Sequence, residues 1–290
     1  MVTINPQIIK VPAFMTKFID ANNLTLIKKI NLIIKGKLTA IVFNKFNQKN
    51  ICRYLNIFFK FEGKLKFENN KYIKITNNHE NKIYYPNLRI TRILLNEKEF
   101  LNHLYESYLL DKIQFKEGDK VLDCGANVGE LFLSFFKKNI EIEYIGFEPD
   151  PNAYECLQLN TNKISHNIAL SSEISNVEFF LDTAGGNSSM SKSFETKNKI
   201  EVKADILKNF ILQNKIKLLK IDAEGNELDV LLGAGNKIKN IEYISVDCGA
   251  EKGFSQETTL IEVNDYLISK NFSLVHINDK RLICLFKNNE

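Results

Sequence analysis

The segment VLDCGANVGE, residues 121–130, decides the fold. Its apolar start is typical of a short buried strand, and its end enters a helix near Gly129, with Gly125 in the turn between them. Small residues at such a turn let the backbone approach a ligand, which then lies across the carboxyl ends of the strands. A glycine pair alone also fits an ordinary tight turn. The segment therefore predicts the first β-α unit of an α/β domain.

An acidic residue at the end of the next predicted strand narrows the choice of ligand. Glu148 lies 148 − 123 = 25 residues after Asp123, and an acid at that position can accept hydrogen bonds from both hydroxyls of a ribose. Dinucleotide sites open with G-x-G-x-x-G and leave the helix N-terminus bare for a pyrophosphate. Here a carboxylate precedes Gly125 instead; it repels a pyrophosphate but suits the ammonium and sulfonium groups of S-adenosylmethionine. We predict that cofactor, with NAD and an NAD-dependent oxidoreductase as the alternative.

Strands and helices alternate along the rest of this half of the chain. We expect strands at 120–123, 143–147, 166–169, 177–181, 200–202, 217–221, 241–246, 273–277 and 282–286, and helices at 131–138, 152–160, 205–213, 227–232 and 258–270. Such alternation predicts a mostly parallel, doubly wound sheet covered on both faces. No helix separates the last two strands, which predicts an antiparallel hairpin at one edge.

The front of the chain has a different pattern and a different charge. Residues 16–60 have helical periodicity, and residues 64–85 read as two or three antiparallel strands with a hairpin turn at Asn69-Asn70. Up to residue 114 the charge is 19 − 8 = +11, and from residue 115 onward it is 20 − 27 = −7. We predict a basic accessory segment over residues 1–95, with helices followed by a small hairpin, and a catalytic domain over residues 96–290.

Composition excludes several classes of protein. Hydrophobic residues make up 44% of the chain and charged residues 26%, as in ordinary globular proteins. The apolar stretch 24–43 holds four lysines, which disfavours a membrane span. The five cysteines have no metal-site or disulfide spacing, so we expect reduced thiols and a cytoplasmic protein. No histidine has a neighbour at ligand spacing, so we expect no metal site, although carboxylates at strand ends suit magnesium.

A family resemblance follows from motifs in a fixed order. The segment 121–130, then Phe147-Glu148-Pro149-Asp150, then Ile168-Ala169-Leu170-Ser171, then Leu219-Lys220-Ile221-Asp222-Ala223-Glu224-Gly225-Asn226-Glu227, resemble the FkbM family of S-adenosylmethionine-dependent methyltransferases. The resemblance covers about residues 105–272. It departs from the family at Asp247, where a glutamate is expected, and at Cys124, where valine or isoleucine is common.

The resemblance implies a class I methyltransferase fold of α/β class: a Rossmann-like, doubly wound, mostly parallel sheet with an antiparallel edge hairpin. The basic N-terminal α+β extension lies outside it. The family implies methyl transfer to a hydroxyl of a sugar or polyketide-derived metabolite, hence an O-methyltransferase with a small-molecule or glycan acceptor. The expected cofactor-binding residues are Asp123, Gly125, Asn127, Gly129, Glu148, Pro149, Asn167, Ala169 and Tyr105. The expected catalytic residues are Asp222 and Glu224, and the expected substrate-binding residues are Asn187, Ser188, Ser189 and Asp247.

Other interpretations stay open for some of these residues. Glu224 also fits a cofactor-ammonium ligand or a helix cap, Asn187–Ser189 an ordinary turn, and Tyr105 core packing. A nitrogen acceptor, in a peptide or a nucleic acid, is the alternative to oxygen. Nucleic acid is disfavoured because no D/N-P-P-Y-type sequence is present. The basic front segment suits docking on an anionic membrane surface, a partner protein or a second subunit, which leaves a homo-oligomer open.

Overall fold

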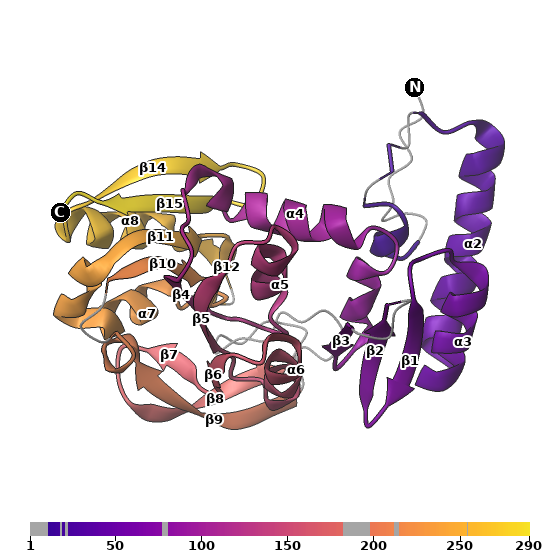
Figure 1. Ribbon diagram of the computed structural model, residues 1–290, viewed down its shortest axis with the longest axis horizontal. Coiled ribbons are helices and arrows are strands. Elements are labelled where there is room, and N and C mark those ends of the chain that lie inside the picture. The colour runs from indigo at the N-terminus through magenta and orange to yellow at the C-terminus, as the bar shows by residue number, and fades with distance from the viewer. Residues whose placement is uncertain are drawn as a thin grey trace. The chain divides into compact units, whose positions relative to one another are not determined.

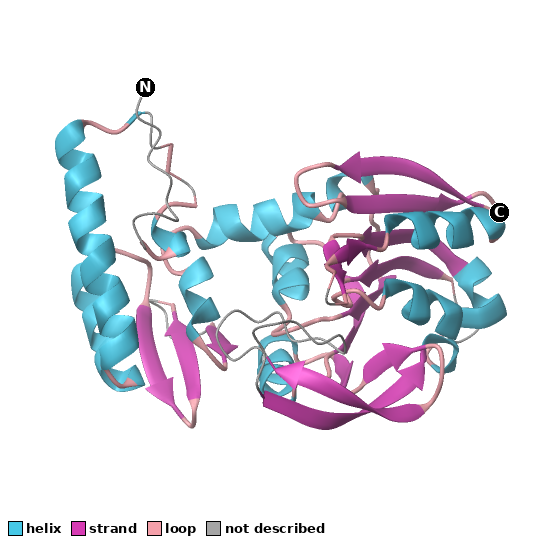
Figure 2. Cartoon of the chain, turned by 180° about the vertical axis from the view of Figure 1, so that it is seen from behind, coloured by secondary structure: helices cyan, strands magenta, loops and turns pink. Residues whose placement is uncertain are grey.

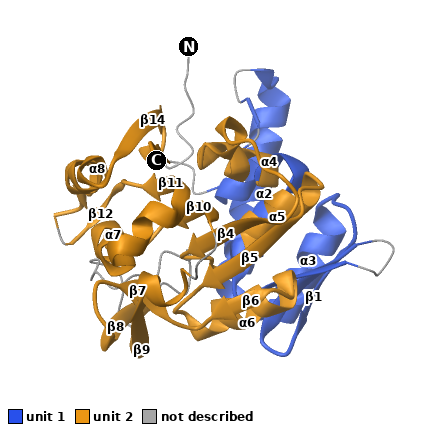
Figure 3. Cartoon of the chain, turned by 60° about the vertical axis from the view of Figure 1, so that its left-hand side comes forward, with its two compact units in different colours: residues 1–100 blue, residues 101–290 orange. Residues whose placement is uncertain are grey.

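The computed structural model describes residues 11–17, 19–20, 23–76, 81–181, 198–211, 215–253 and 255–290. The chain divides into two compact units, residues 1–100 and residues 101–290 (Figure 3). The first unit contains most of the basic front segment, and the second contains the glycine segment 121–130.

The second unit is built on a central sheet. Among the described residues its strands are β4 (Asp119–Cys124), β5 (Ile142–Phe147), β6 (Ile164–His166), β10 (Ile216–Ile221), β11 (Ile241–Asp247), β14 (Phe272–Asn278) and β15 (Ile283–Asn288). They lie in the order β14-β15-β11-β10-β4-β5-β6 (Figure 1). Strands β11 to β6 are parallel, whereas β15 is antiparallel to both β11 and β14. This is the class I methyltransferase fold, and it confirms the predicted edge hairpin.

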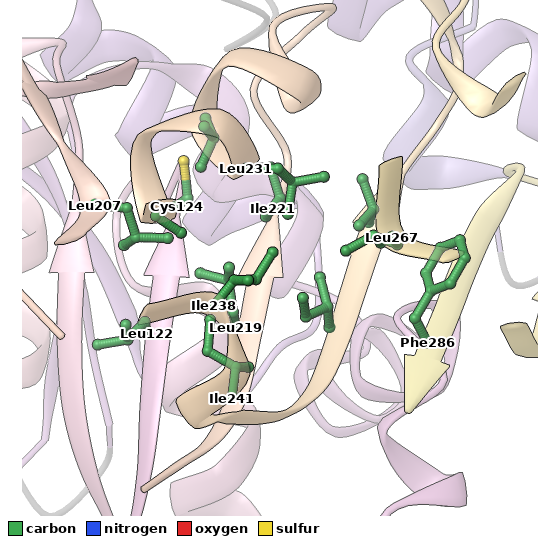
Figure 4. Close-up of a cluster of buried hydrophobic side chains, with 14 of the residues drawn as sticks. Leu122, Cys124, Leu207, Leu219, Ile221, Leu231, Ile238, Ile241, Leu267 and Phe286 are labelled. Carbon is green, nitrogen blue, oxygen red and sulfur yellow. The ribbon is translucent and has the colours of Figure 1, made fainter. Parts of the chain in front are cut away.

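Helices cover both faces of this sheet, as the seven apolar strands require. They are α4 (Glu97–Ser107), α5 (Glu130–Lys137), α6 (Pro151–Thr161), α7 (Glu227–Ala234) and α8 (Leu260–Ser269), with 3-10 turns at η4 (Leu110–Lys112), η5 (Leu207–Asn209) and η6 (Gly235–Asn240). Leu122 and Leu219 pack with Leu231 of α7 in one buried cluster (Figure 4). Their strand neighbours Val121 and Leu218 belong to a second cluster, which includes α5. Each such buried side chain stabilises the fold by about 1.5–3 kcal/mol.

A second, smaller sheet lies in the region where we predicted the strand 166–169 and the helix 205–213. Its strands β7 (Ala169–Ser171), β8 (Ser175–Leu181) and β9 (Asn198–Ile206) lie in the order β7-β9-β8. The predicted strand 166–169 is split between β6 and β7 because Asn167 turns the chain there and donates to the carbonyls of Glu148 and Pro149. The predicted helix 205–213 was wrong in its described part: β9 runs to Ile206 and only the turn η5 follows. A further pair is β12 (Ala250–Lys252) with β13 (Glu257–Thr258).

The first unit combines a helix pair with a hairpin sheet (Figure 2). Its elements are η1 (Ala13–Met15), α2 (Leu26–Lys45), α3 (Gln48–Phe58), β1 (Lys64–Glu68), β2 (Lys71–Ile75), β3 (Lys82–Tyr85) and η3 (Leu88–Ile93). The helical stretch is divided at Asn47, whose side chain caps α3 by accepting from the Asn50 N–H. Asn69 and Asn70 both have positive φ, which confirms the predicted hairpin turn. Within the described ranges, every helix is too short or too polar to cross a membrane.

Candidate functional site

The glycine segment forms the turn between β4 and α5. Gly125 has φ +73°, and a Cβ there would lie 2.0 Å from the carbonyl oxygen of Asp222, so no other residue fits without moving one backbone. Gly129, at φ +86°, occupies the N-cap of α5. The N–H groups of Gly125 and Ala126 donate to the carbonyl of Phe147 at 3.1 and 3.0 Å. The turn is therefore held against the ends of both β5 and β10.

Glu148 follows β5 and accepts hydrogen bonds on both carboxylate oxygens. The N–H of Asn127 donates to Oε2 at 2.7 Å, and the N–H of Asp150 donates to Oε1 at 2.8 Å. The side chain is buried, and burial raises the pKa of Glu148 to about 7, although these two donors favour the carboxylate. Each oxygen retains capacity for a further donor. The predicted loop and the predicted acid are thus joined directly through Asn127.

A cavity that is open to solvent lies where β4, β5 and β10 end. Glu148 and Asp222 are the acidic residues of its wall, and Gly125, Pro149 and Ala169 also line it, as the sequence indicated. The apolar part of the wall comprises Cys124, Phe147, Ile168, Leu170, Phe179 and Ala223. A small cavity that is mostly apolar, with a few convergent polar groups, is the usual form of a ligand site.

Asp123 lies behind the loop, away from the described cavity wall. Its carboxylate is fully buried, forms an ion pair with Lys220 at 3.0 Å and accepts from the Tyr144 hydroxyl at 2.6 Å. Lys220 also donates to the carbonyls of Cys124 and Gly125 at 3.0 and 2.8 Å. Asp123 and Lys220 therefore shape the glycine turn from within. Direct contact of Asp123 with the cofactor stays a prediction.

Four acidic residues gather where β10 and β11 end, here called the acid cluster: Asp222, Glu224, Asp247 and Glu251. Oxygen atoms of Asp222, Glu224 and Glu251 lie within 4.8 Å of one another. Burial and the neighbouring carboxylates raise the pKa of Glu224 well above its usual range, and Glu224 is hydrogen-bonded to Glu251. Two carboxyl groups this close share a proton. Oxygen atoms arranged in this way also suit a magnesium ion.

Glu224 lies in a strained turn that Glu227 supports. Its φ is +51°, a left-handed conformation that costs energy in a residue with a side chain. Glu227 supports this turn by accepting from the N–H groups of Ala223 and Gly225 at 3.1 and 3.0 Å. Burial raises the pKa of Glu227 to about 7. The last acid of the Asp222–Glu227 signature thus holds the turn that carries the first two.

Two residues that sequence reasoning missed complete this region. Arg281, in the turn between β14 and β15, pairs with Asp222 at 3.0 Å and with Asp247 at 2.8 Å. The hydroxyl of Tyr108 donates to Oδ2 of Asp222. The Tyr108 ring lies 5.1 Å from both the Lys220 Nζ and the Arg281 Cζ. One carboxylate oxygen of Asp222 is therefore gripped by a phenol and a guanidinium.

The remaining predicted residues have other placements. Tyr105 packs edge-on against Phe135 at a centroid distance of 5.3 Å, in the core, as its helical spacing allowed. Asn167 is exposed, and its amide joins the Glu148 strand end to β7 without lining the cavity. The predicted substrate residues Asn187, Ser188 and Ser189 lie outside the described residues. Asp247 ends β11, almost fully buried, behind Arg281.

The residues present fit S-adenosylmethionine. Glu148 offers a carboxylate at the cavity wall to two ribose hydroxyls, and Ile168, Leu170 and Phe179 offer an apolar surface to an adenine. Asp222 places a second carboxylate on the same wall. Among the described residues that line the cavity, none carries a positive charge that could pair with a pyrophosphate.

Comparisons with known proteins agree with this fit. A profile of the FkbM methyltransferase domain matches residues 123–274. Methyltransferase 1 of Beauveria bassiana is 22% identical over 205 residues, which cover 60% of this chain and 82% of that protein. Hexuronic acid methyltransferase AglP of Haloferax volcanii is 26% identical over 142 residues, which cover 47% of this chain and 58% of that protein.

Solved structures with a similar backbone are more distant. One is M. capricolum TrmK in complex with S-adenosylhomocysteine, at 10% identity and a TM-score of 0.37, covering 66% of this chain and 68% of that one. Another is the ribosomal protein L11 methylase of Lactobacillus delbrueckii subsp. bulgaricus, at 10% identity and a TM-score of 0.39, covering 67% and 79%.

The family match covers more than half of the chain, and it includes the glycine turn, Glu148, the acid cluster and the strands β5, β10 and β11. It decides between the two cofactors considered for this site in favour of S-adenosylmethionine. The chain belongs to the FkbM family of S-adenosylmethionine-dependent methyltransferases.

Proposed function

We propose that the chain transfers the methyl group to a hydroxyl of a sugar or of a similar polar small molecule. The observation that carries this proposal is the carboxylate of Asp222, which lines the cofactor cavity while Tyr108 and Arg281 hold it from one side. An alcohol must lose a proton as its oxygen gains a methyl group, so a fixed carboxylate at this position suits it. The relative AglP, named a hexuronic acid methyltransferase, supports a sugar acceptor.

The cofactor supplies a methyl group that the sulfonium charge has already activated. When bound, the cofactor would supply the methyl group to the acceptor oxygen, and Asp222 would accept the proton that the hydroxyl loses. Tyr108 and Arg281 fix the direction of that carboxylate before the acceptor arrives. Positioning of this kind supplies about 7–11 kcal/mol of barrier reduction in well-oriented reactions.

Within the acid cluster, the two catalytic candidates Asp222 and Glu224 have different partners, and we assign them different roles. Glu224 shares a proton with Glu251 and has a raised pKa, so at neutral pH it is a poor base and a good hydrogen-bond donor. Asp222 is instead paired with the guanidinium of Arg281 at 3.0 Å. In this proposal Asp222 is the base, Glu224 donates a hydrogen bond to the acceptor, and Asp247 holds Arg281.

Product analysis tests the proposal. Purified protein is incubated with S-adenosylmethionine and a panel of hexuronic acid glycosides, neutral hexosides and amine-bearing peptides, and S-adenosylhomocysteine release and the methylated atom are recorded by mass spectrometry and NMR. We expect an O-methyl product. Asp222→Asn should lower kcat by about 10²–10⁴-fold. The control variant Asp265→Asn makes the same change at an exposed aspartate of α8 and should leave kcat unchanged. Methylation of nitrogen, or full kcat in Asp222→Asn, would contradict it.

A further inference from the structure

Helix α2 is apolar on two opposite faces. One face packs into the first unit, where Gly36 and Thr39 are buried and Thr39 hydrogen-bonds to Tyr54 of α3 at 3.0 Å. The opposite face carries exposed aliphatic side chains, each 47–73% exposed: Leu26, Ile27, Ile30, Ile34, Leu38 and Ile41. At 100° per residue these six positions fall within about 120° of the helix circumference. We call them the α2 stripe.

The α2 stripe is long and continuous. A helix of 20 residues extends for about 30 Å, and the stripe runs from its first residue to Ile41. Single exposed apolar side chains are normal on a protein surface, but a contiguous row of six marks a docking surface. The fold of the first unit does not need these side chains to be apolar, because the helix is already held through its other face.

Positive charge surrounds the stripe. Residues 21–60 contain eight lysines and arginines and no aspartate or glutamate. Two of the lysines, Lys37 and Lys45, are exposed and share the angular sector of the stripe. Lys28 and Lys29 follow its N-terminal end. An apolar stripe with interleaved lysines and no acidic residue is the composition of helices that lie in the surface of an anionic membrane.

Two other occupants fit less well. A second copy of α2 would bring its lysines against the same lysines, without an acidic residue on either helix to neutralise them. A folded protein partner usually binds through aromatic and arginine anchors, whereas the exposed face of α2 contains only leucine, isoleucine, lysine and asparagine. Lipid requires neither anchors nor a complementary shape.

We propose that the α2 stripe docks on an anionic lipid surface. The helix lies flat, its leucines and isoleucines enter the boundary between headgroups and acyl chains, and its lysines contact the phosphates. The proposal concerns the first unit and does not depend on which acceptor is methylated.

Vesicle co-sedimentation of the full chain tests this docking. The probes are vesicles of phosphatidylcholine alone and vesicles of phosphatidylcholine with phosphatidylglycerol. We expect binding to the anionic vesicles only, and weaker binding at high salt. Reversing two charges in Lys37→Glu/Lys45→Glu should weaken binding about thirty-fold or more. The matched control Lys203→Glu/Lys208→Glu changes two exposed lysines of the second unit and should bind normally.

A second pair of variants tests the apolar contribution. Ile34→Gln/Leu38→Gln should lose binding, and Ile261→Gln/Ile268→Gln, which alters two exposed isoleucines of α8, should keep it. Circular dichroism checks that each variant is folded. Three results would overturn the proposal: no binding of the wild type to anionic vesicles, equal binding to neutral vesicles, or equal loss in the control variants. A wild-type dimer in analytical ultracentrifugation that Ile34→Gln/Leu38→Gln converts to monomer would also overturn it, in favour of a second copy.

Discussion

The affinity for S-adenosylhomocysteine should fall as the pH falls below 7, and Glu148 should be the group responsible. Its carboxylate lines the cavity and is offered to two ribose hydroxyls, which donate to the ionised form. Burial raises the pKa of Glu148 to about 7 in the ligand-free protein. Binding of a hydroxyl pair stabilises the carboxylate, so the ligand must displace a proton at lower pH.

The size of the effect follows from that pKa. At about pH 5 the group lies about two units below its pKa, so the affinity should be up to about 100-fold weaker than at about pH 8, equal to about 2.7 kcal/mol. The direction is that of a group that binds ligand only when deprotonated: full affinity above the pKa and progressive loss below it. Near pH 6, binding should release up to about one proton.

Isothermal titration calorimetry with S-adenosylhomocysteine measures both quantities. Affinity is followed across the pH range, and proton release is obtained from buffers of different ionisation enthalpy. Glu148→Gln should bind weakly at every pH and lose the steep part of the profile. Glu173→Gln, a change at an exposed glutamate, should leave the profile intact. The pKa values of Glu227 and Asp247 are also raised, to about 7 and about 6, so only the slope that Glu148→Gln removes belongs to Glu148. A flat wild-type profile, or an unchanged slope in Glu148→Gln, would refute the reasoning.

Three other tests address the same region. Tyr108→Phe should lower kcat about ten-fold by releasing one partner of Asp222, while S-adenosylhomocysteine affinity is unchanged; equal losses in both would indicate general damage. Lys220→Met should cost about 3–5 kcal/mol of unfolding free energy in urea melts, because it leaves the Asp123 carboxylate buried without its cation; a loss below about 1 kcal/mol would argue against that ion pair. The raised pKa of Glu148 means that this group binds its proton more tightly in the folded state than in the unfolded state. The contribution of Glu148 to the free energy of unfolding is therefore fully present below the unfolded pKa and is lost as the pH rises through about 7. The ligand-free protein should therefore melt at a higher temperature near pH 5.5 than near pH 8; a higher Tm at the alkaline pH would contradict this sign.

Local sequence signals were sufficient to predict the glycine turn and the carboxylates at the strand ends. A short apolar run before an acid and a glycine defines a strand end wherever it occurs, and parallel strands bring such ends to one edge. Asp222, Asp247 and Glu148 were predictable for this reason. The strand order could be inferred only through the family resemblance, because apolar strands of a parallel sheet resemble one another.

The remaining residues of the site depend on contacts that no local pattern records. Arg281 reaches the acid cluster from a hairpin turn 59 residues beyond Asp222. In the sequence Tyr108 lies beside the apolar residues Leu109 and Leu110, and only the fold shows that its hydroxyl meets a carboxylate. For Asp123 the local pattern indicated a ligand contact, whereas in the fold its carboxylate is paired with Lys220 and accepts from Tyr144. Similarly, the sequence alone does not distinguish the packed face of α2 from its exposed face.

The close approach of Gly125 to the Asp222 carbonyl has a thermodynamic consequence. The N–H of Asp222 also donates to the carbonyl of Cys124 at 3.1 Å, so the two peptides can move only together. Any shift of the glycine turn on cofactor binding would therefore reorient Asp222, the residue assigned to the acceptor. Linkage makes any such cooperativity reciprocal: an acceptor that binds more tightly to the cofactor-loaded protein must, by the same factor, retain the cofactor.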